Sequence, residues 1–486
     1  MKRISCIYVL LLIIFTALSV LTVTACSDNE QTGNHTKGLT YSLNKDELSY
    51  GCSGIGTATD TEIVIPSEYK GLPVTSIRQN AFNNCTEIVS VVIPDSVTTI
   101  GRAAFYNCTS LASITVPGSV TEIGDVAFEN CTALENITLP EAIDSWGNNV
   151  FDNTAYFNDD NNYTDGVLYI GNYLVKAKKE ISGSYEIRQN TRAILNYAFH
   201  SCYKLTGITI PDSLTTIGDT AFYNTALTEI TIPKSVTAIK PSAFFYCTKL
   251  ENVYWNAEDC TKIGYQAFSH CSSLKKVIFG DGVQTVPDEI FRECDSIKTV
   301  VIGNDVTDIG DDAFYKCTSI TDLTLGNGIE KISGGAFWGC EKLNKITIPD
   351  SVVTIERSAF AYCSGLTEIT IGSGVVTIGS DAFIDCKKVT KIYWNATECI
   401  STGPESNYML THFDGRCFSG CDNLNTVVVG SNVKHMPSYV FYGFSHLTRL
   451  EYDGTLEQWA SVTKGTWWNV GSHFTVYCTD GTSWME

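Results

Sequence analysis

The sequence predicts a repeat solenoid, a right-handed curved rod of about 15 coils that is mainly β-structure with short helical or 3-10 turns. Three observations lead to this fold class. A phenylalanine returns at an almost constant spacing, a short run of alternating apolar and polar residues keeps a fixed distance from it, and proline or glycine ends most of these runs. Such repeats stack because no single unit can bury its apolar side alone.

The repeated phenylalanine sets the period of the chain. Ten of its fourteen intervals are 23 residues, two are 22 and 24, and the intervals of 48 and 35 mark insertions. The positions are Phe82, Phe105, Phe128, Phe151, Phe199, Phe222, Phe244, Phe268, Phe291, Phe314, Phe337, Phe360, Phe383, Phe418 and Phe441. A period of about 20 to 29 residues with aliphatic positions in register is typical of a leucine-rich-repeat solenoid.

One unit illustrates the elements that we expect in every coil. Residues 114–116 alternate apolar and polar, which suits a short strand with one face inward. Pro117 then turns the chain, and residues 120–123 form a second extended piece. Phe128 follows on a helical or 3-10 turn and fills the core. Stacked about 4.8 Å apart as parallel sheets, fifteen such coils span roughly 70 Å.

Two segments carry a more specific pattern, "TGITIPDSLTTIGDTAF" at residues 206–222 and "NKITIPDSVVTIERSAFAYC" at residues 344–363. They resemble the repeat of the bacterial surface-antigen (BspA-like) leucine-rich repeat family, which also occurs in treponemes and some protozoa. The resemblance covers about residues 61–450. It implies a surface-exposed solenoid, and members of the family have been implicated in adhesion to host proteins and other bacteria. No catalytic residues come with the family.

The insertion after Phe151 contains "GVLYIGNYLVKA" at residues 166–177, two apolar runs around a Gly-Asn pair that predict a β-hairpin. This stretch is basic within an acidic chain, because it carries Lys176, Lys178, Lys179, Arg188 and Arg192. Two interpretations stay open. The cations form a contact site for an acidic partner, or they protect a solvated hairpin edge.

The chain divides into five predicted regions. Residues 1–25 are a lipoprotein signal peptide, 26–39 a polar tether and 40–78 an N-terminal cap. Residues 79–450 hold the leucine-rich repeats, with insertions at about 152–180 and 401–415, and residues 451–486 form a C-terminal cap. Caps are expected because the end coils would otherwise expose their apolar edges.

The N-terminus predicts export. Lys2 and Arg3 precede an apolar run at residues 4–21, and "VTAC" at residues 23–26 resembles the lipobox of bacterial lipoproteins. That resemblance implies cleavage before Cys26 and attachment of acyl chains to this residue, which would anchor the protein in a membrane. The alternative is an uncleaved signal anchor of about 20 residues.

Cysteine takes one position of the repeat in twelve units: Cys85, Cys108, Cys131, Cys202, Cys247, Cys271, Cys294, Cys317, Cys340, Cys363, Cys386 and Cys421. Stacking in register makes their Cα–Cβ vectors parallel, whereas a disulfide needs vectors that converge. Units without the cysteine place Thr154, Thr225 or Phe444 there. We therefore expect structural core thiols of high pKa. Unpaired thiols are unusual in an exported protein, and an anaerobic habitat is our hypothesis for them.

Other chemistry finds little support in the sequence. A formal charge of −20 argues against nucleic acid as a partner, which attracts basic patches. The seven histidines are scattered and no C-x-x-C occurs. The nearest metal-like group is His412, Cys417 and Cys421, whose cysteines the repeat already explains. Phosphate loops and nucleophile elbows are also missing, so we expect no enzyme, metal or cofactor.

The remaining candidates for function are exposed apolar side chains. Tyr254, Ile278 and Val301 occupy the outward strand position of adjacent coils and should form an apolar strip, and Tyr393 has the same place in a later coil. Trp467 and Trp468 lie in the C-terminal cap, where they form either an aromatic platform for sugar rings or part of the cap core.

These observations favour a surface protein without catalysis. Our first hypothesis is a monomeric, lipid-anchored protein on the outer face of the bacterial cell membrane or outer membrane that binds a protein or cell-surface ligand. It would touch the membrane only through its N-terminal lipid. The alternatives are a lipoprotein that captures glycans or nutrients and a passive structural spacer of the envelope.

Overall fold

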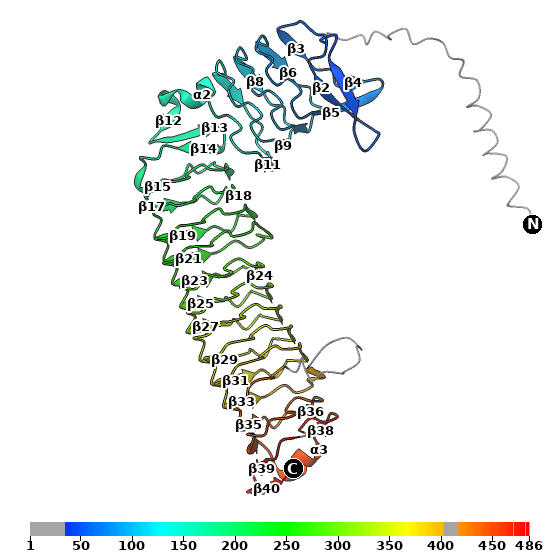
Figure 1. The fold of residues 1–486 in the computed structure, drawn as a ribbon, viewed down its shortest axis with the longest axis vertical. Coiled ribbons are helices and arrows are strands. Elements are labelled where there is room, and N and C mark those ends of the chain that lie inside the picture. Colours follow the sequence, from blue (N-terminus) through cyan, green and yellow to red (C-terminus); the bar gives the residue numbers. More distant parts are fainter. Residues whose placement is uncertain (1–34, 403–416, 470, 482, 486) are drawn as a thin grey trace, which may run out of the picture.

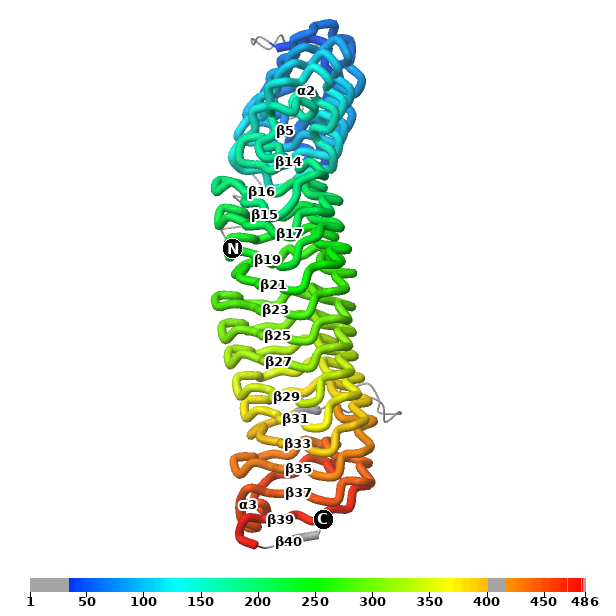
Figure 2. Tube along the Cα trace, turned by 90° about the vertical axis from the view of Figure 1, so that its left-hand side faces the viewer, coloured from blue at the N-terminus to red at the C-terminus, as the bar shows by residue number. Residues whose placement is uncertain are grey.

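The computed structural model describes residues 35–402, 417–469, 471–481 and 483–485. The chain is a β-solenoid of about 18 stacked turns, which confirms the predicted fold class. The sequence-based number of about 15 is lower because it counted only coils that contain the repeated phenylalanine. Figure 1 shows a rod that bends near β12–β15, and Figure 2 shows the strands of the long arm lying one below another.

Each regular coil contributes two strands, and we call them the first strand and the second strand. The first strands are β3 (Glu62–Val64), β6 (Ser90–Val92), β8 (Ser113–Thr115), β10 (Asn136–Thr138), β15 (Ser182–Glu186), β17 (Lys204–Thr209), β19 (Glu229–Ile232), β21 (Asn252–Trp255), β23 (Lys276–Phe279), β25 (Thr299–Val301), β27 (Asp322–Thr324), β29 (Lys345–Thr347), β31 (Glu368–Ile371), β33 (Lys391–Trp394), β35 (Thr426–Val429), β37 (Arg449–Tyr452) and β39 (Thr475–Cys478). They form parallel sheets whose outer surface we call the first-strand face.

The second strands are two residues long, except for β5, and form separate sheets along another side of the rod. They are β5 (Leu72–Ile77), β7 (Thr99–Ile100), β9 (Glu122–Ile123), β11 (Ser145–Trp146), β16 (Ala193–Ile194), β18 (Thr216–Ile217), β20 (Ala238–Ile239), β22 (Lys262–Ile263), β24 (Thr285–Val286), β26 (Asp308–Ile309), β28 (Lys331–Ile332), β30 (Thr354–Ile355), β32 (Thr377–Ile378), β34 (Ser401–Thr402), β36 (His435–Met436) and β38 (Thr463–Lys464).

The remaining elements lie at the ends and at the first insertion. At the N-terminal end are β1 (Thr40–Leu43), β2 (Tyr50–Gly54) and β4 (Glu68–Tyr69). The insertion contains α2 (Ala155–Asn158), the 3-10 turn η1 (Asp160–Asn162), β12 (Tyr163–Thr164), β13 (Val167–Ile170) and β14 (Tyr173–Ala177). The C-terminal end contains α3 (Leu456–Ser461) and β40 (Ser483–Met485), which pairs antiparallel with β39. The predicted loop at 401–415 lies almost entirely outside the described residues.

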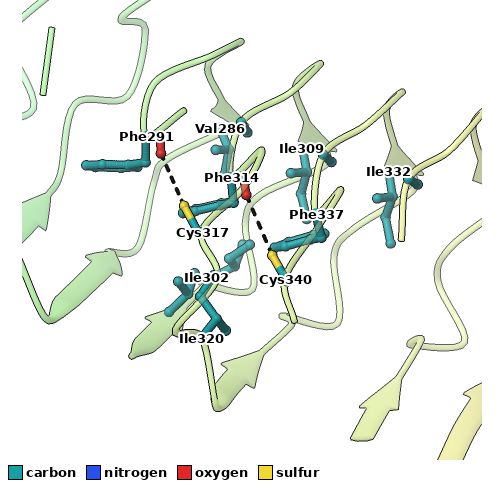
Figure 3. Close-up of a cluster of buried hydrophobic side chains, with 14 of the residues drawn as sticks. Val286, Phe291, Ile302, Ile309, Phe314, Cys317, Ile320, Ile332, Phe337 and Cys340 are labelled. Carbon is teal, nitrogen blue, oxygen red and sulfur yellow. Dashed lines mark hydrogen bonds between the residues drawn. The ribbon is translucent and has the colours of Figure 1, made fainter. Parts of the chain in front are cut away.

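The core is a stack of similar layers, one from each coil. The ring centroids of Phe314 and Phe337 are 5.3 Å apart and their planes differ by only 4°. Cys317 and Cys340 lie beside these rings and are fully buried (Figure 3). Glycine follows the second strand in many coils because the coils approach closely there: a Cβ on Gly124 would stand 2.5 Å from the backbone nitrogen of Arg102.

The predicted hairpin is confirmed as β13 and β14, but the interpretation of its edge as solvated is wrong. β14 pairs parallel with β16, so the hairpin is part of the second-strand sheet. All four residues of β13 are buried. Val167 and Tyr169 pack into the core of the C-terminal arm, whereas Leu168 and Ile170 pack into the core of the N-terminal arm. The hairpin thus joins the two cores at the bend.

Candidate functional site

The predicted apolar strip on the first-strand face is present. Tyr254 lies beside Ile278 in the register of β21 and β23, and Ile278 lies beside Val301 in the register of β23 and β25. All three side chains are half-buried, because the sheet covers their bases and leaves their ends in solvent. Thr231 and Thr324 continue the same row on either side and are exposed. The strip is therefore three coils long.

Lysines flank this strip on the side where the first strands begin. Lys275 pairs with Glu251 at 3.0 Å. Lys276 and Lys298 have no ion pair among the residues that the structure describes. The chain as a whole has a formal charge of −20, so two unpaired cations give the surface beside this strip a positive charge that differs from the acidic average. They favour a partner that brings both apolar and acidic groups.

Tyr393 belongs to a second strip, nearer the C-terminus, that is more polar. Its row continues through Val428 and Glu451 to Tyr477 in the register of β33, β35, β37 and β39. The ammonium of Lys391 lies 4.8 Å from the ring centroid of Tyr393. Cations over exposed rings contribute only about 0.5–1 kcal/mol each, so this strip offers less to a ligand than the apolar one.

The two tryptophans named from the sequence occupy different environments. Trp468 is only 6% exposed and packs against Trp459 and Phe474, so its assignment to an exposed binding surface is wrong. Trp467 is 52% exposed and its ring lies 6.1 Å from that of Tyr442. The two residues lie in a turn in which Trp467 adopts a positive φ of 57°, and this turn leaves one ring in the cap core and the other in solvent.

The sequence analysis missed a third surface, which we call the aromatic ridge. It consists of the one or two residues after each buried phenylalanine from Phe199 to Phe360. Its members are His200, Tyr223, Phe245, Tyr246, His270, Arg292, Tyr315, Lys316, Trp338 and Tyr362. The signal in the sequence is the recurrence of an aromatic residue directly after the Ala-Phe pair.

Rings of the ridge stack from coil to coil and stay partly exposed. The ring centroids of His200 and Tyr223 are 4.7 Å apart, and those of Tyr315 and Trp338 are 4.6 Å apart. The guanidinium of Arg292 lies 4.1 Å from the centroid of Tyr315. Burial, and then the neighbouring charges of Lys176 and Lys179, lower the pKa of His200. Tyrosine, tryptophan and arginine are the residues most enriched at the centres of protein interfaces.

Several cations of the basic insertion are already engaged within the chain. Lys178 pairs with Asp160 at 2.6 Å, and the guanidinium of Arg188 lies 4.0 Å from the ring centroid of Tyr169. An open hollow of about 420 Å³ lies beside β15, with Asp165, Lys178 and Glu180 among its lining residues. Its charges are mixed, and no set of groups converges on one point.

The repeat cysteines lie in the core at the position that the period gives them. They form no disulfides with one another, and every one except Cys85 is fully buried. Burial raises the pKa of Cys294 to about 12 and that of Cys247 to about 11. A thiol held protonated at neutral pH is a poor nucleophile and a poor metal ligand. Within the described ranges no three His, Cys, Asp or Glu side chains gather as a metal site would require.

The part of the chain that the structure describes contains no helix long and apolar enough to cross a membrane. Cys26 and the predicted signal peptide at residues 1–25 lie outside the described residues.

The stacked two-strand coils define a leucine-rich-repeat solenoid. Comparison with family models identifies the family: the chain belongs to the family described as BspA type leucine rich repeat region (6 copies). The family model matches residues 59–182, 169–298, 284–403 and 399–462. The predicted resemblance is therefore confirmed. No curated protein was found to be similar to the chain.

Several solved structures are similar to it. A leucine-rich repeat protein from Bacteroides ovatus is 23% identical, with 83% of this chain and 95% of that chain covered and a TM-score of 0.31. A leucine rich cell surface protein from Faecalibacterium prausnitzii is 24% identical, with coverage of 90% and 98% and a TM-score of 0.29. The pneumococcal vaccine antigen PcpA is 15% identical, with coverage of 91% and 97% and a TM-score of 0.34.

Proposed function

We propose that this protein is displayed on a bacterial cell surface by a lipid on Cys26 and binds another protein through its first-strand face, without catalysis. Membership of the BspA-type family supports a role in binding. The N-terminal apolar run and lipobox-like "VTAC" support export and anchoring. The buried thiols supply no reactive group, which supports a role in recognition rather than chemistry.

The observation that carries the proposal is the strip formed by Tyr254, Ile278 and Val301. The repeat explains the buried side chains of these coils, but it does not explain three successive apolar side chains on their outer surface, where seven other coils place threonine. An apolar strip on a sheet, with Lys276 and Lys298 beside it, fits a partner surface that is apolar at its centre and acidic at its rim.

The test is binding of the chain from Ser27 onward to purified matrix proteins and bacterial envelope proteins. If the proposal is right, one of these proteins binds the wild-type chain and binds the Ile278→Asp variant of the chain at least about tenfold more weakly. It is unaffected by Val92→Asp, a matched control on the same face of the N-terminal arm, where Val92 is exposed. Failure of every candidate to bind, or equal losses with both variants, would overturn the proposal.

Glycan capture remains the second candidate, and the exposed ring of Trp467 is the observation that favours it. A glycan array probed with the wild-type chain and with Trp467→Ala separates the two candidates. Glycan binding that depends on Trp467 and survives Ile278→Asp would replace the first proposal with this one. A chain that binds in neither assay is a passive spacer.

A further inference from the structure

The side of the rod that carries the aromatic ridge is divided into a basic part and an acidic part. Four consecutive turns, at residues 195–205, 218–227, 240–250 and 264–274, contain Lys204, Lys240 and Lys249 with Asp219 as their single acidic residue. The next two turns reverse this balance. At residues 287–297 and 310–320 they hold Arg292 and Lys316 against six acidic residues: Asp288, Glu289, Glu293, Asp295, Asp311 and Asp312.

The charges of the two parts are available for contacts with another molecule. Lys204 and Lys249 are exposed, Lys240 is half-buried, and none of the three has an ion pair among the described residues. In the acidic part both cations form ion pairs with neighbouring carboxylates: Arg292 pairs with Asp312, and Lys316 lies 3.8 Å from Glu293. That leaves a surplus of negative charge.

The remaining acidic groups include two that are well placed for contact. Glu289 and Asp295 are exposed and have no ion pair in the described part of the chain. The two parts of the ridge therefore have opposite net charge. They lie on successive coils of a rigid rod, so they cannot fold onto each other.

Both parts also carry partly exposed rings. The basic part has Tyr223, Phe245 and Tyr246, with the last 40% exposed. The acidic part and the coils that follow it have Tyr315, Trp338 and Tyr362, with the last 42% exposed. A surface with rings along its centre and opposite charges at its two ends is complementary to its own antiparallel copy.

We propose that two copies of this chain associate through the aromatic ridge. The copies lie antiparallel, so that the basic part of each faces the acidic part of the other, and the two-fold axis crosses near the turn at residues 264–274. A parallel arrangement is disfavoured because it would bring like charges together. The dimer uses a different side of the rod from the strip on the first-strand face. It goes beyond the proposed binding function and replaces the monomer expected from the sequence.

Shape and ionic conditions allow this contact. The coils from β17 to β31 form a straight stack in both views (Figures 1 and 2). The axis at residues 264–274 brings seven turns of each copy into contact, from 195–205 to 333–343. At about 4.8 Å per coil, these seven turns give a contact strip roughly 30 Å long. The formal charge of −20 per chain opposes association at long range. At physiological salt the screening length is about 8 Å, which weakens that repulsion more than it weakens direct contacts.

The test is the oligomeric state of the chain from Ser27 onward, which contains every described residue, measured by sedimentation equilibrium in reductant at physiological salt. The basic-part variant is Lys240→Glu with Lys249→Glu, and the acidic-part variant is Glu289→Lys with Asp295→Lys. We expect a wild-type dimer, and each variant alone should dissociate at least about tenfold more readily. An equimolar mixture of the two variants should restore a mixed dimer, because both of its contact pairs are again of opposite charge.

A matched control separates this contact from the effect of net charge. Lys234→Glu with Lys262→Glu makes the same change in net charge on other sides of neighbouring coils, and it should leave the dimer intact. A wild-type chain that stays monomeric up to roughly 100 μM would overturn the proposal. So would a charge-reversed variant that dimerises with the dissociation constant of the wild-type chain, or a mixture that does not reassociate. Binding at the first-strand face is scored separately, with Ile278→Asp, so the two proposals fail independently.

Discussion

The Sγ atom of Cys317 lies 3.2 Å from the carbonyl oxygen of Phe291, one coil earlier, and donates a hydrogen bond to it (Figure 3). The same carbonyl accepts the backbone N–H of Cys294 at 3.1 Å. Equivalent thiol bonds recur along the rod, for example from Cys131 to Phe105 at 3.1 Å. The cysteine thus contributes a polar link between coils as well as filling, which explains its preference over alanine or valine at this position.

We expect Cys317→Ala to lower the free energy of unfolding by about 1–3 kcal/mol. The change removes the bond to Phe291 and leaves a small cavity between two layers. Cys317→Ser keeps a donor of similar size and should cost less. Urea unfolding followed by circular dichroism measures both values. Equal stability of the alanine variant and the wild-type chain would show that the thiol bond contributes nothing.

Alkaline pH should destabilise the rod through its buried thiols. Burial raises the pKa of Cys294 to about 12 and that of Cys247 to about 11, above the ordinary thiol value of about 9. A raised pKa in the folded state gives stability that is complete below about pH 9 and is lost as pH rises toward 11–12. Each thiol then costs about 1.4 kcal/mol per pH unit within this window.

The measurement for this linkage is the dependence of the urea midpoint on pH between 8 and about 10.5. Tyrosines and lysines titrate in the same range, so the informative comparison is with the double variant Cys247→Ala, Cys294→Ala. The free energy of unfolding of this variant should fall less steeply with pH, because its unfolding releases about two protons fewer in this range. Parallel curves for the two proteins would contradict the linkage.

Cys85 should be the first repeat cysteine to react with a maleimide in the native chain. It is half-buried, and within the described residues its thiol donates to no phenylalanine carbonyl, because the coil before it lacks the repeated phenylalanine. Mass spectrometry of peptides after brief labelling identifies the site, and Cys85→Ser should abolish the fast reaction. Equally fast labelling at a buried position such as Cys317, or a requirement for reductant before any labelling, would contradict this assignment.

The sequence was sufficient for the periodic part of the fold because each repeat is constrained by its two neighbours. Phe314, Cys317 and their equivalents lie where the period places them. It was insufficient where the period breaks. Nothing local to β13 and β14 shows that they join the sheet through β16, since that pairing depends on how two cores meet. Likewise the sequence does not distinguish Trp467 from Trp468, because the exposure of each side chain depends on how the cap packs.

Of the candidate surfaces, the sequence predicted the apolar strip but not the aromatic ridge. The row containing Tyr254 and Ile278 follows from strand alternation, which the sequence displays. The aromatic ridge arises in turns, where positive φ recurs two residues after each repeated phenylalanine and the alternation of a strand does not indicate which side chains point outward. Asn224 and Tyr246, for instance, adopt positive φ values of 53° and 60° in equivalent turns. Which turn side chains point outward together was therefore decided by the stacking of coils.

The bend between the two arms should depend on one buried hydroxyl. Tyr173 is fully buried, and its Oη atom donates to the carbonyl oxygen of Pro140 and accepts the backbone N–H of Ile143, each at 2.9 Å. Tyr173→Phe leaves the buried N–H of Ile143 without a partner and removes the donor to the half-buried Pro140, at a cost of about 1–3 kcal/mol. Because the loss falls where the two cores meet, amide exchange at Ile143 should accelerate before exchange in the long arm.

The control for this variant is Tyr169→Phe in the same hairpin. The hydroxyl of Tyr169 pairs with that of Tyr185 at 3.1 Å, and Tyr185 is half-buried, so water can replace the lost group. We expect this control to leave amide exchange at Ile143 unchanged and to cost less stability. If both variants accelerate that exchange equally, the hydroxyl of Tyr173 is not what holds the segment at residues 140–143 to the hairpin, and the junction depends on apolar packing alone.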